Sequence, residues 1–247
     1  MEYTNSHRLL LTYIRSVRYV SQTDLIQVFG RIRTHVQGDE RQDQDGNDIE
    51  QQLDDHINII NKHIVDHGFR IDRRMDECTS ELYYIYINAI GNDDISKTYS
   101  NYTVNELHCI KQLIDEIIES PQFEFAIGKV NASQKVVATQ NKTIREAQAF
   151  ISNLIDNGWF ILNENDRLLL SPRSLGELKD YLIGRYNTYF DDGRIFVCNG
   201  CKQIVTLGYL LESENSCYHY KCFDIFQRTN PGDYNKIQIG VELSSLP

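Results

Sequence analysis

Three stretches near the start of the chain place apolar residues at helical spacing. They cover residues 7–19, the residues after Ser21, and residues 49–67. Gly68 follows the third stretch, at the position where a helix C-cap belongs. Residues 38–48 (GDERQDQDGND) are polar and acidic, which predicts an exposed loop. We therefore expect three helices, with a loop between the second and the third.

The next apolar positions alternate with polar ones, as in a β-hairpin. The alternation covers residues 69–72 and 81–87, with turn-forming residues between them. The order of three helices and a hairpin is that of a winged helix, a relative of the helix-turn-helix in which the hairpin forms the wing. The first part of the chain is therefore predicted to be a winged-helix domain.

A second copy of this order follows. Three capping boxes, in which Ser or Thr precedes Glu by three residues, predict helix starts at Thr103 with Glu106, Thr143 with Glu146, and Ser174 with Glu177. A short strand is expected at 123–127, and a hairpin at 159–162 and 167–170. The pattern predicts a second winged helix.

The predicted fold class is α+β, mainly helical with small β-hairpins. A turn-rich stretch at 187–194 separates the second winged helix from a small C-terminal segment. We expect a first winged-helix domain at 1–94, a second at 95–190, and a third, small domain at 191–247.

Composition narrows the class of protein. The 247 residues carry 25 Lys and Arg against 35 Asp and Glu, a net charge of −10, so the chain as a whole repels a phosphate backbone. The polar start of the chain and the lack of an apolar run of about 18 residues predict no secretion signal and no membrane span. The six cysteines are then expected to be reduced thiols, for which metal binding is commoner than disulfide formation.

The last quarter of the chain has the ligand spacing of one tetrahedral zinc site. Cys198-x2-Cys201 and His219-x2-Cys222 are separated by seventeen residues. Two thiolates of a C-x2-C turn can reach one ion, and His219 and Cys222 lie three apart at the start of a predicted helix. Cys217 is a possible alternative ligand that could replace His219 or Cys222, or it could take no part in the site or be a remnant of a second site. The alternative without metal is that the cysteines are small buried hydrophobic residues.

These residues resemble a known family. Phe196-Val-Cys198-Asn-Gly-Cys201, Ile204-Val-Thr-Leu-Gly208 and His219-Tyr-Lys-Cys222-Phe223, behind two winged helices, are similar to the non-structural maintenance of chromosomes element 1 family. Members of that family are RING-like subunits of the SMC five/six complex, which acts in DNA repair and recombination. The resemblance implies a nuclear, chromosome-associated protein whose partners are a MAGE-like subunit and a kleisin subunit.

The resemblance implies that residues 191–247 form a variant RING-like zinc-binding domain. It also shows a departure from the family's finger, which holds two zinc ions. Cys198, Cys201, His219 and Cys222 match the ligands of the first ion. Residues 211–214 and 224–240 offer no Cys or His for the second. We therefore expect one Zn²⁺, with the second lobe supported by packing that includes Ile237, Ile239 and Val241, whose alternation predicts a strand.

Without ligands for a second zinc ion, the sequence is compatible with two functions. A RING-type ubiquitin-protein ligase binds a ubiquitin-conjugating enzyme and holds its thioester in a reactive geometry, so it needs no catalytic residue of its own. The alternative is a non-catalytic structural adaptor that binds the MAGE-like and kleisin subunits. Family resemblance favours the ligase, and the loss of one zinc site weakens that inference.

The helices before the two hairpins lack the charge expected for DNA binding. Residues 49–67 carry four acidic residues and one Lys, and residues 143–158 carry Arg145 against Glu146 and Asp156. Such helices gain nothing from counterion release. Protein binding is the favoured interpretation, with DNA contacted only indirectly or weakly, through short basic stretches such as Arg70, Arg73 and Arg74 or Lys129, Lys135 and Lys142.

Overall fold

The computed structural model describes residues 2–37, 46–89 and 102–241, which form two compact units. The first unit is Met1–Met75 with Glu81–Gly91, and the second is Asp76–Ser80 with Asn92–Pro247. The predicted boundary at 94/95 lies outside the described residues. The helices and small antiparallel sheets confirm the predicted α+β class.

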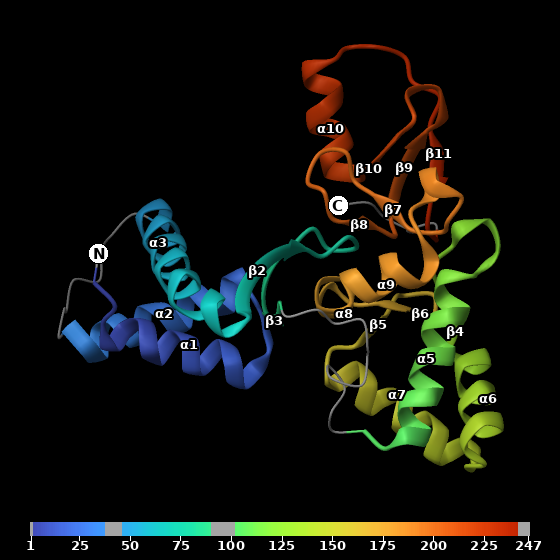
Figure 1. Ribbon diagram of the computed structural model, residues 1–247, viewed down its shortest axis with the longest axis horizontal. Helices are drawn as coiled ribbons and strands as arrows, with labels where there is room; N and C mark the ends of the chain where they lie inside the picture. Colours follow the sequence, from blue (N-terminus) through green and yellow to red (C-terminus); the bar gives the residue numbers. More distant parts are fainter. Residues whose placement is uncertain (1, 38–45, 90–101, 242–247) are drawn as a thin grey trace. The chain divides into compact units, whose positions relative to one another are not determined.

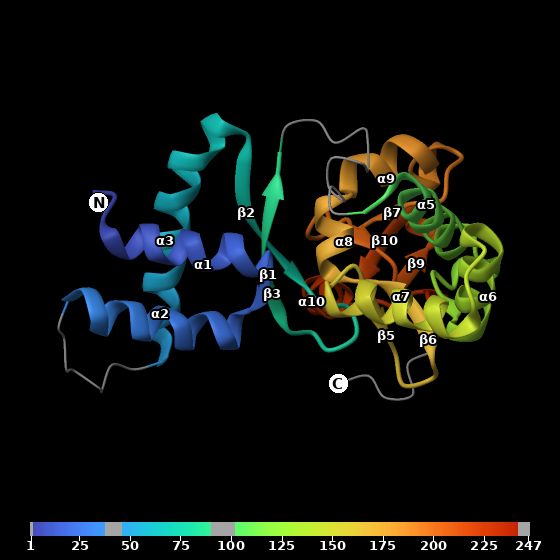
Figure 2. The ribbon, with the colours of Figure 1, turned by 90° about the horizontal axis from the view of Figure 1, so that it is seen from below.

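The first unit packs three helices against a three-stranded sheet. α3 runs across α1 and α2, as Figures 1 and 2 show. The sheet has the order β1-β3-β2, and both pairings are antiparallel. The elements are α1 (Asn5–Val17), β1 (Tyr19–Ser21), α2 (Gln22–Gln37), α3 (Gly46–Ile64), the 3₁₀ turn η1 (Val65–His67), β2 (Phe69–Met75) and β3 (Leu82–Asn88).

The first unit has a hydrophobic core of its own. Leu10, Phe29, Leu53 and Ile60 come from its three helices, and all four are fully buried. Gly68 takes a left-handed conformation with φ of 77° and ends η1, as the sequence predicted. The predicted loop at 38–48 is wrong at its end, because α3 already begins at Gly46, and residues 38–45 lie outside the described residues.

The second unit begins with helices that pack on another three-stranded sheet, in the antiparallel order β4-β6-β5. α5, α6 and α7 lie together in Figure 1. The elements are α5 (Val104–Ile118), the 3₁₀ turn η2 (Pro121–Phe123), β4 (Ile127–Gly128), α6 (Lys129–Gln140), α7 (Ile144–Asp156), β5 (Phe160–Leu162), β6 (Arg167–Leu170), α8 (Pro172–Glu177), α9 (Lys179–Tyr186) and the 3₁₀ turn η3 (Tyr189–Asp191).

One strand of this part was predicted wrongly, and one helix was not predicted. Residues 123–127 are not a strand throughout, because η2 extends to Phe123 and strand pairing begins only at Ile127. α6 was not predicted, since its sequence KVNASQKVVATQ has a weak amphipathic pattern.

The capping boxes show how short-range chemistry sets helix starts. Thr103 caps α5 and Thr143 caps α7, each by accepting a hydrogen bond from the backbone N–H of the Glu three residues later. The third predicted box is wrong: Ser171 is the cap, and its Oγ accepts from the backbone N–H of Ser174. Ser174 lies inside α8, where its hydroxyl donates to the backbone carbonyl of Trp159.

The C-terminal part of the second unit carries two further small sheets and one helix. β7 pairs with β8, and β9 lies between β10 and β11. Figure 1 shows α10 beside these strands. The elements are β7 (Phe196–Val197), β8 (Ile204–Val205), β9 (Gly208–Leu211), the 3₁₀ turn η4 (Glu212–Glu214), β10 (Ser216–His219), α10 (Tyr220–Thr229) and β11 (Ile237–Ile239). We call residues 195–241 the finger.

The finger shares one hydrophobic core with the helices that precede it. The buried cluster is continuous from Cys109 in α5 to Ile239 in β11. Phe196 is at the junction, with its ring centroid 5.0 Å from that of Phe123 and 4.5 Å from that of Tyr189. The guanidinium of Arg194 lies 4.3 Å from the centroid of the Phe123 ring. Aromatic packing of this kind fixes where the finger begins.

Aromatic packing also supports the half of the finger around Phe223, for which the sequence predicted support by packing and not by a metal ion. Tyr218 stacks on Phe226 at 4.8 Å between centroids, and Tyr234 lies 5.4 Å from Phe226. The ammonium of Lys236 lies 5.1 Å from the centroids of the Tyr209 and Phe223 rings.

The predicted strand at the end of the finger is present. β11 contributes buried Ile239, and Val241 beyond it is also buried. Ile237 is 40% exposed, so only part of the predicted apolar set supports the lobe.

The cap of α8 gives a stability prediction. Ser171→Ala should lower the free energy of unfolding by about 1–3 kcal/mol, because it leaves the buried backbone groups of Ser174 and Gly158 without their partner. Denaturant unfolding followed by tryptophan fluorescence at Trp159 would measure this change. The control Ser152→Ala, at an exposed position of α7, should change stability by less than about 0.5 kcal/mol. Equal effects of the two substitutions would contradict the assignment of the cap.

Candidate metal centre

Two separate turns of the chain supply the residues of the predicted zinc site. Cys198 and Cys201 lie in the connection between β7 and β8, where the Lys202 amide donates to the Cys198 carbonyl at 2.9 Å. His219 ends β10 and is the N-cap of α10, and Cys222 lies in the first turn of that helix. The spacing of three residues places both side chains on one side of the helix start.

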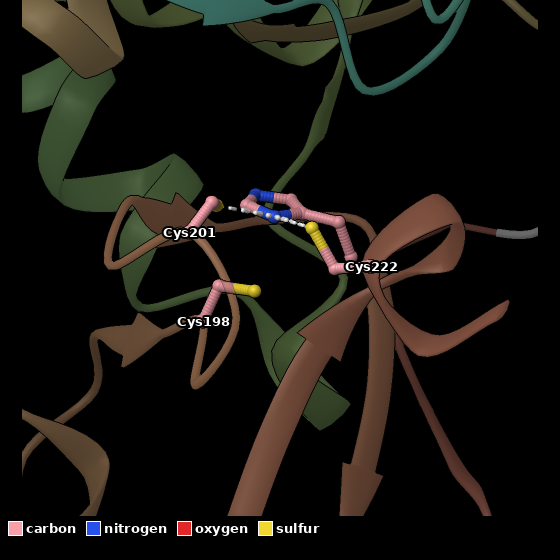
Figure 3. Close-up of side chains that lie close together, drawn as sticks. Cys198, Cys201 and Cys222 are labelled. Atoms are coloured by element: carbon pink, nitrogen blue, oxygen red, sulfur yellow. Dashed lines mark hydrogen bonds between the residues drawn. The ribbon is translucent and has the colours of Figure 1, made fainter. Parts of the chain in front are cut away.

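The structure brings the four predicted ligands together. Their donor atoms, one per residue, all lie within 4.8 Å of one another. His219 Nδ1 is 3.3 Å from Cys201 Sγ and 3.8 Å from Cys222 Sγ, and Figure 3 shows these contacts beside Cys198. Tetrahedral zinc with bonds of about 2.3 Å to sulfur and 2.0 Å to nitrogen requires about 3.5 Å between the two atoms. The residues therefore fit one Zn²⁺.

The electrostatics of the group favour a bound cation. Hydrogen bonds from the thiols of Cys201 and Cys222 lower the pKa of Cys198 far below its usual value, although burial opposes the shift. The pKa of Cys222 is raised, first by the proton that it donates to Cys198. The hydrogen bonds to Cys198 therefore favour its thiolate, which is the form that binds a metal ion.

The imidazole of His219 responds to the same charge. Burial by itself would lower its pKa, but hydrogen bonds to Cys198, Cys201 and Glu77 raise the pKa to about 12. The positively charged form of the His219 imidazole is thus favoured even in the absence of a metal ion. A Zn²⁺ ion would supply that positive charge and would displace the protons of the ligands.

Cys217 lies apart from this group. Its thiol is fully buried and donates to the Val197 carbonyl at 3.0 Å, and burial raises its pKa to about 12. Its donor atom is not among the four that gather. Cys217 behaves as the buried hydrophobic residue that the sequence offered as an alternative to a ligand.

One residue at the site was missed by the sequence analysis. Glu77 Oε1 lies 2.9 Å from Nε2 of His219, on the side of the ring away from the thiols. Glu77 is in the turn Asp76–Ser80, which belongs to the second unit although it precedes most of that unit in sequence. No local pattern signals this contact, because it joins distant parts of the chain.

Comparison with known proteins identifies the family. Residues 7–178 match the family described as "Nse1 non-SMC component of SMC5-6 complex". This is more than half of the chain. The chain belongs to the Nse1 family. The match ends before Cys198, so it rests on the helical domains and not on the finger.

Curated relatives agree with the family. The chain is 29% identical over 177 residues to "Non-structural maintenance of chromosomes element 1 homolog" of Xenopus tropicalis, covering 71% of this chain and 63% of that protein. It is 21% identical to "Non-structural maintenance of chromosomes element 1" of Schizosaccharomyces pombe, covering 69% of this chain and 70% of that protein. The chain thus spans less than two thirds of the length of the frog Nse1 relative.

A solved structure shows the same fold. A chain of an "Nse1-Nse3-Nse4 complex" superposes with a TM-score of 0.71 at 20% identity, over 95% of this chain and 98% of the other. This similarity extends to the finger, which the family match does not reach. The Nse1 fold is therefore retained over nearly the whole chain.

The site geometry predicts one metal ion per chain. Native mass spectrometry should find one Zn²⁺ on the unmodified chain and none on the Cys198→Ser, Cys201→Ser double variant, because two ligands cannot hold the ion. Cys217→Ser is the matched control and should keep one Zn²⁺, since a hydroxyl can still donate to Val197. Zinc lost from Cys217→Ser, or a stoichiometry of zero or two in the unmodified chain, would contradict the assignment.

Proposed function

We propose that this chain is an Nse1-type subunit of the SMC5-6 complex that assembles with a MAGE-like Nse3 subunit and a kleisin Nse4 subunit. The observation that carries the proposal is the similarity over 95% of the chain to a chain of an Nse1-Nse3-Nse4 complex. Such a subunit acts on nuclear chromosomes, in DNA repair and recombination. None of the described helices is long and apolar enough to cross a membrane.

The proposal includes two tandem winged helices, at 1–94 and 95–190, and a one-zinc RING-like domain at 191–247, which contains the finger. An internal repeat supports it. In both units a helix is followed by a short strand, two more helices and a hairpin. The short strands β1 and β4 each pair with the second hairpin strand, β3 and β6. This shared topology is the arrangement expected of a duplicated winged helix.

Protein binding, and not direct DNA binding, fits the charges of the winged helices. The basic residues near the first wing are engaged: Arg73 pairs with Asp54 at 2.7 Å, and Arg70 pairs with Asp72 at 3.3 Å. In the second unit Lys135 pairs with Glu116 at 2.5 Å. A lysine or arginine already paired with a carboxylate gives little gain from counterion release on DNA.

Reconstitution tests the assembly. Co-expression with the MAGE-like and kleisin subunits of the same genome should yield a complex of one copy each, measured by size-exclusion chromatography with light scattering. The isolated chain should bind duplex DNA only weakly in an anisotropy titration at physiological salt. Elution of this chain alone, or tight salt-sensitive DNA binding without partners, would contradict the proposal.

Partner-dependent ubiquitin-protein ligase activity is a second candidate. It is favoured by the grouping of three cysteines and a histidine in a RING-like finger, and its partner would be a ubiquitin-conjugating enzyme. A RING acts by positioning the charged thioester, so a rigid docking surface is required. Aromatic packing around Tyr218 and Phe226 gives the finger that rigidity where the family has a second metal. A non-catalytic adaptor requires only that the finger is folded by this packing and needs no docking surface for a conjugating enzyme.

A ubiquitination assay separates the two candidates. With the MAGE-like partner, a charged conjugating enzyme and the unmodified chain, the ligase hypothesis predicts discharge of the thioester to lysine at least tenfold above background. Replacing Cys198 and Cys201 by Ser should abolish the stimulation, and Cys217→Ser should retain it. Background rates with the unmodified chain, in a complex shown to contain zinc, would leave the adaptor as the function.

A further inference from the structure

A buried carboxylate lies behind the histidine of the candidate metal site. Glu77 Oε1 is 2.9 Å from His219 Nε2, and the Glu77 side chain is only 6% exposed. The other ring nitrogen, Nδ1, faces the sulfurs of Cys201 and Cys222. The imidazole is thus placed between the metal position on one side and a carboxylate on the other.

Several hydrogen bonds fix Glu77 in this position. Its Oε1 also accepts from the Thr206 backbone N–H at 3.0 Å, and its Oε2 accepts from the Thr206 hydroxyl. Thr206 follows β8, whose Ile204 carbonyl lies 3.0 Å from His219 Nε2. The carboxylate is therefore stabilised as an anion by hydrogen-bond donors and does not depend on solvent.

The turn that carries Glu77 is itself well defined. Asp76 Oδ1 accepts from the backbone N–H groups of Cys78 and Thr79, both at 2.8 Å, which closes the turn. The Lys221 ammonium, beside the ligand Cys222 in sequence, donates to the Ser80 carbonyl at 3.3 Å. Cys78 packs beside Tyr220 against a small apolar cluster that includes Leu207 and Val241. Both ends of the turn are thereby attached to the finger.

We propose that Glu77 is a positioning residue for the zinc site, acting through His219. The carboxylate accepts the Nε2 proton, which leaves Nδ1 as the free donor toward the metal and fixes the orientation of the ring. Its charge also makes the imidazole a stronger donor to the cation. Glu77 thereby makes zinc retention depend on the placement of the turn Asp76–Ser80.

This inference rests on the proposed zinc site, and zinc release from the full chain tests it. We expect Glu77→Ala to raise the dissociation rate of Zn²⁺ into a colorimetric chelator by about 10- to 100-fold. Glu77→Gln keeps an oxygen that can accept from His219 and a group that can bond Thr206, but it removes the charge. It should release zinc at an intermediate rate and remain folded.

The readouts separate positioning from a merely structural role. In nitrogen-15 NMR of the zinc-loaded chain, the His219 Nε2–H should be a slowly exchanging proton that becomes fast-exchanging in Glu77→Ala. The matched control Glu212→Gln, an exposed carboxylate of the same finger, should release zinc at the unmodified rate.

Each outcome decides one hypothesis. Unmodified release rates in both Glu77 variants would overturn the role of Glu77 while leaving the zinc site in place. A normal rate in Glu77→Gln with rapid loss only in Glu77→Ala would overturn the contribution of the charge and leave the hydrogen bond to His219 as the means of positioning, because the amide oxygen still accepts from Nε2. A chain that binds no Zn²⁺ in its unmodified form would instead refute the zinc site itself.

Discussion

The second unit depends on the packing of Phe196 against Phe123, Phe125 and Tyr189. Phe196 is 1% exposed and lies two residues before Cys198, so the aromatic contacts determine where the first two sulfurs can be. The finger contributes to the same hydrophobic core as α5 and has no separate one. Because the interior is densely packed, Cys198, two residues after Phe196, has little freedom to move. A bound metal ion would therefore only adjust sulfur positions that packing has already restricted.

The finger combines two kinds of support that act at different places. On one side a cluster of three cysteines and one histidine could be held together by a metal ion. On the other, aromatic rings in edge-to-face and tilted contacts pack around Phe223 together with the Lys236 ammonium. The first support depends on metal supply and pH, whereas the second depends on buried apolar area. Packing of this kind can order one half of the finger without a metal ligand there.

The sequence was sufficient where the determinants were local. Capping by Thr103 and Thr143, the end of a helix at Gly68, and the gathering of four ligands all follow from residues a few positions apart or from metal-ligand spacing. The sequence was not sufficient where contacts between separate elements determine the structure. α6 has little amphipathic pattern and is held by contacts with α5 and α7. One local pattern was also misleading, because Ser174 satisfies the capping pattern, whereas Pro172 favours the first position of the helix and makes Ser171 the cap.

The turn Asp76–Ser80 also has a consequence for the order of folding. Glu77 and Thr206 are 129 residues apart in sequence, whereas the hairpin β2–β3 and the β9–β10 pair close over short loops. Loop-closure entropy makes contacts of high sequence separation form late. During synthesis the turn is complete long before its binding surface on the finger exists. A fragment beginning at residue 95 would lack Glu77 and would never form this contact. In such a fragment, His219 would lack its carboxylate partner at Nε2.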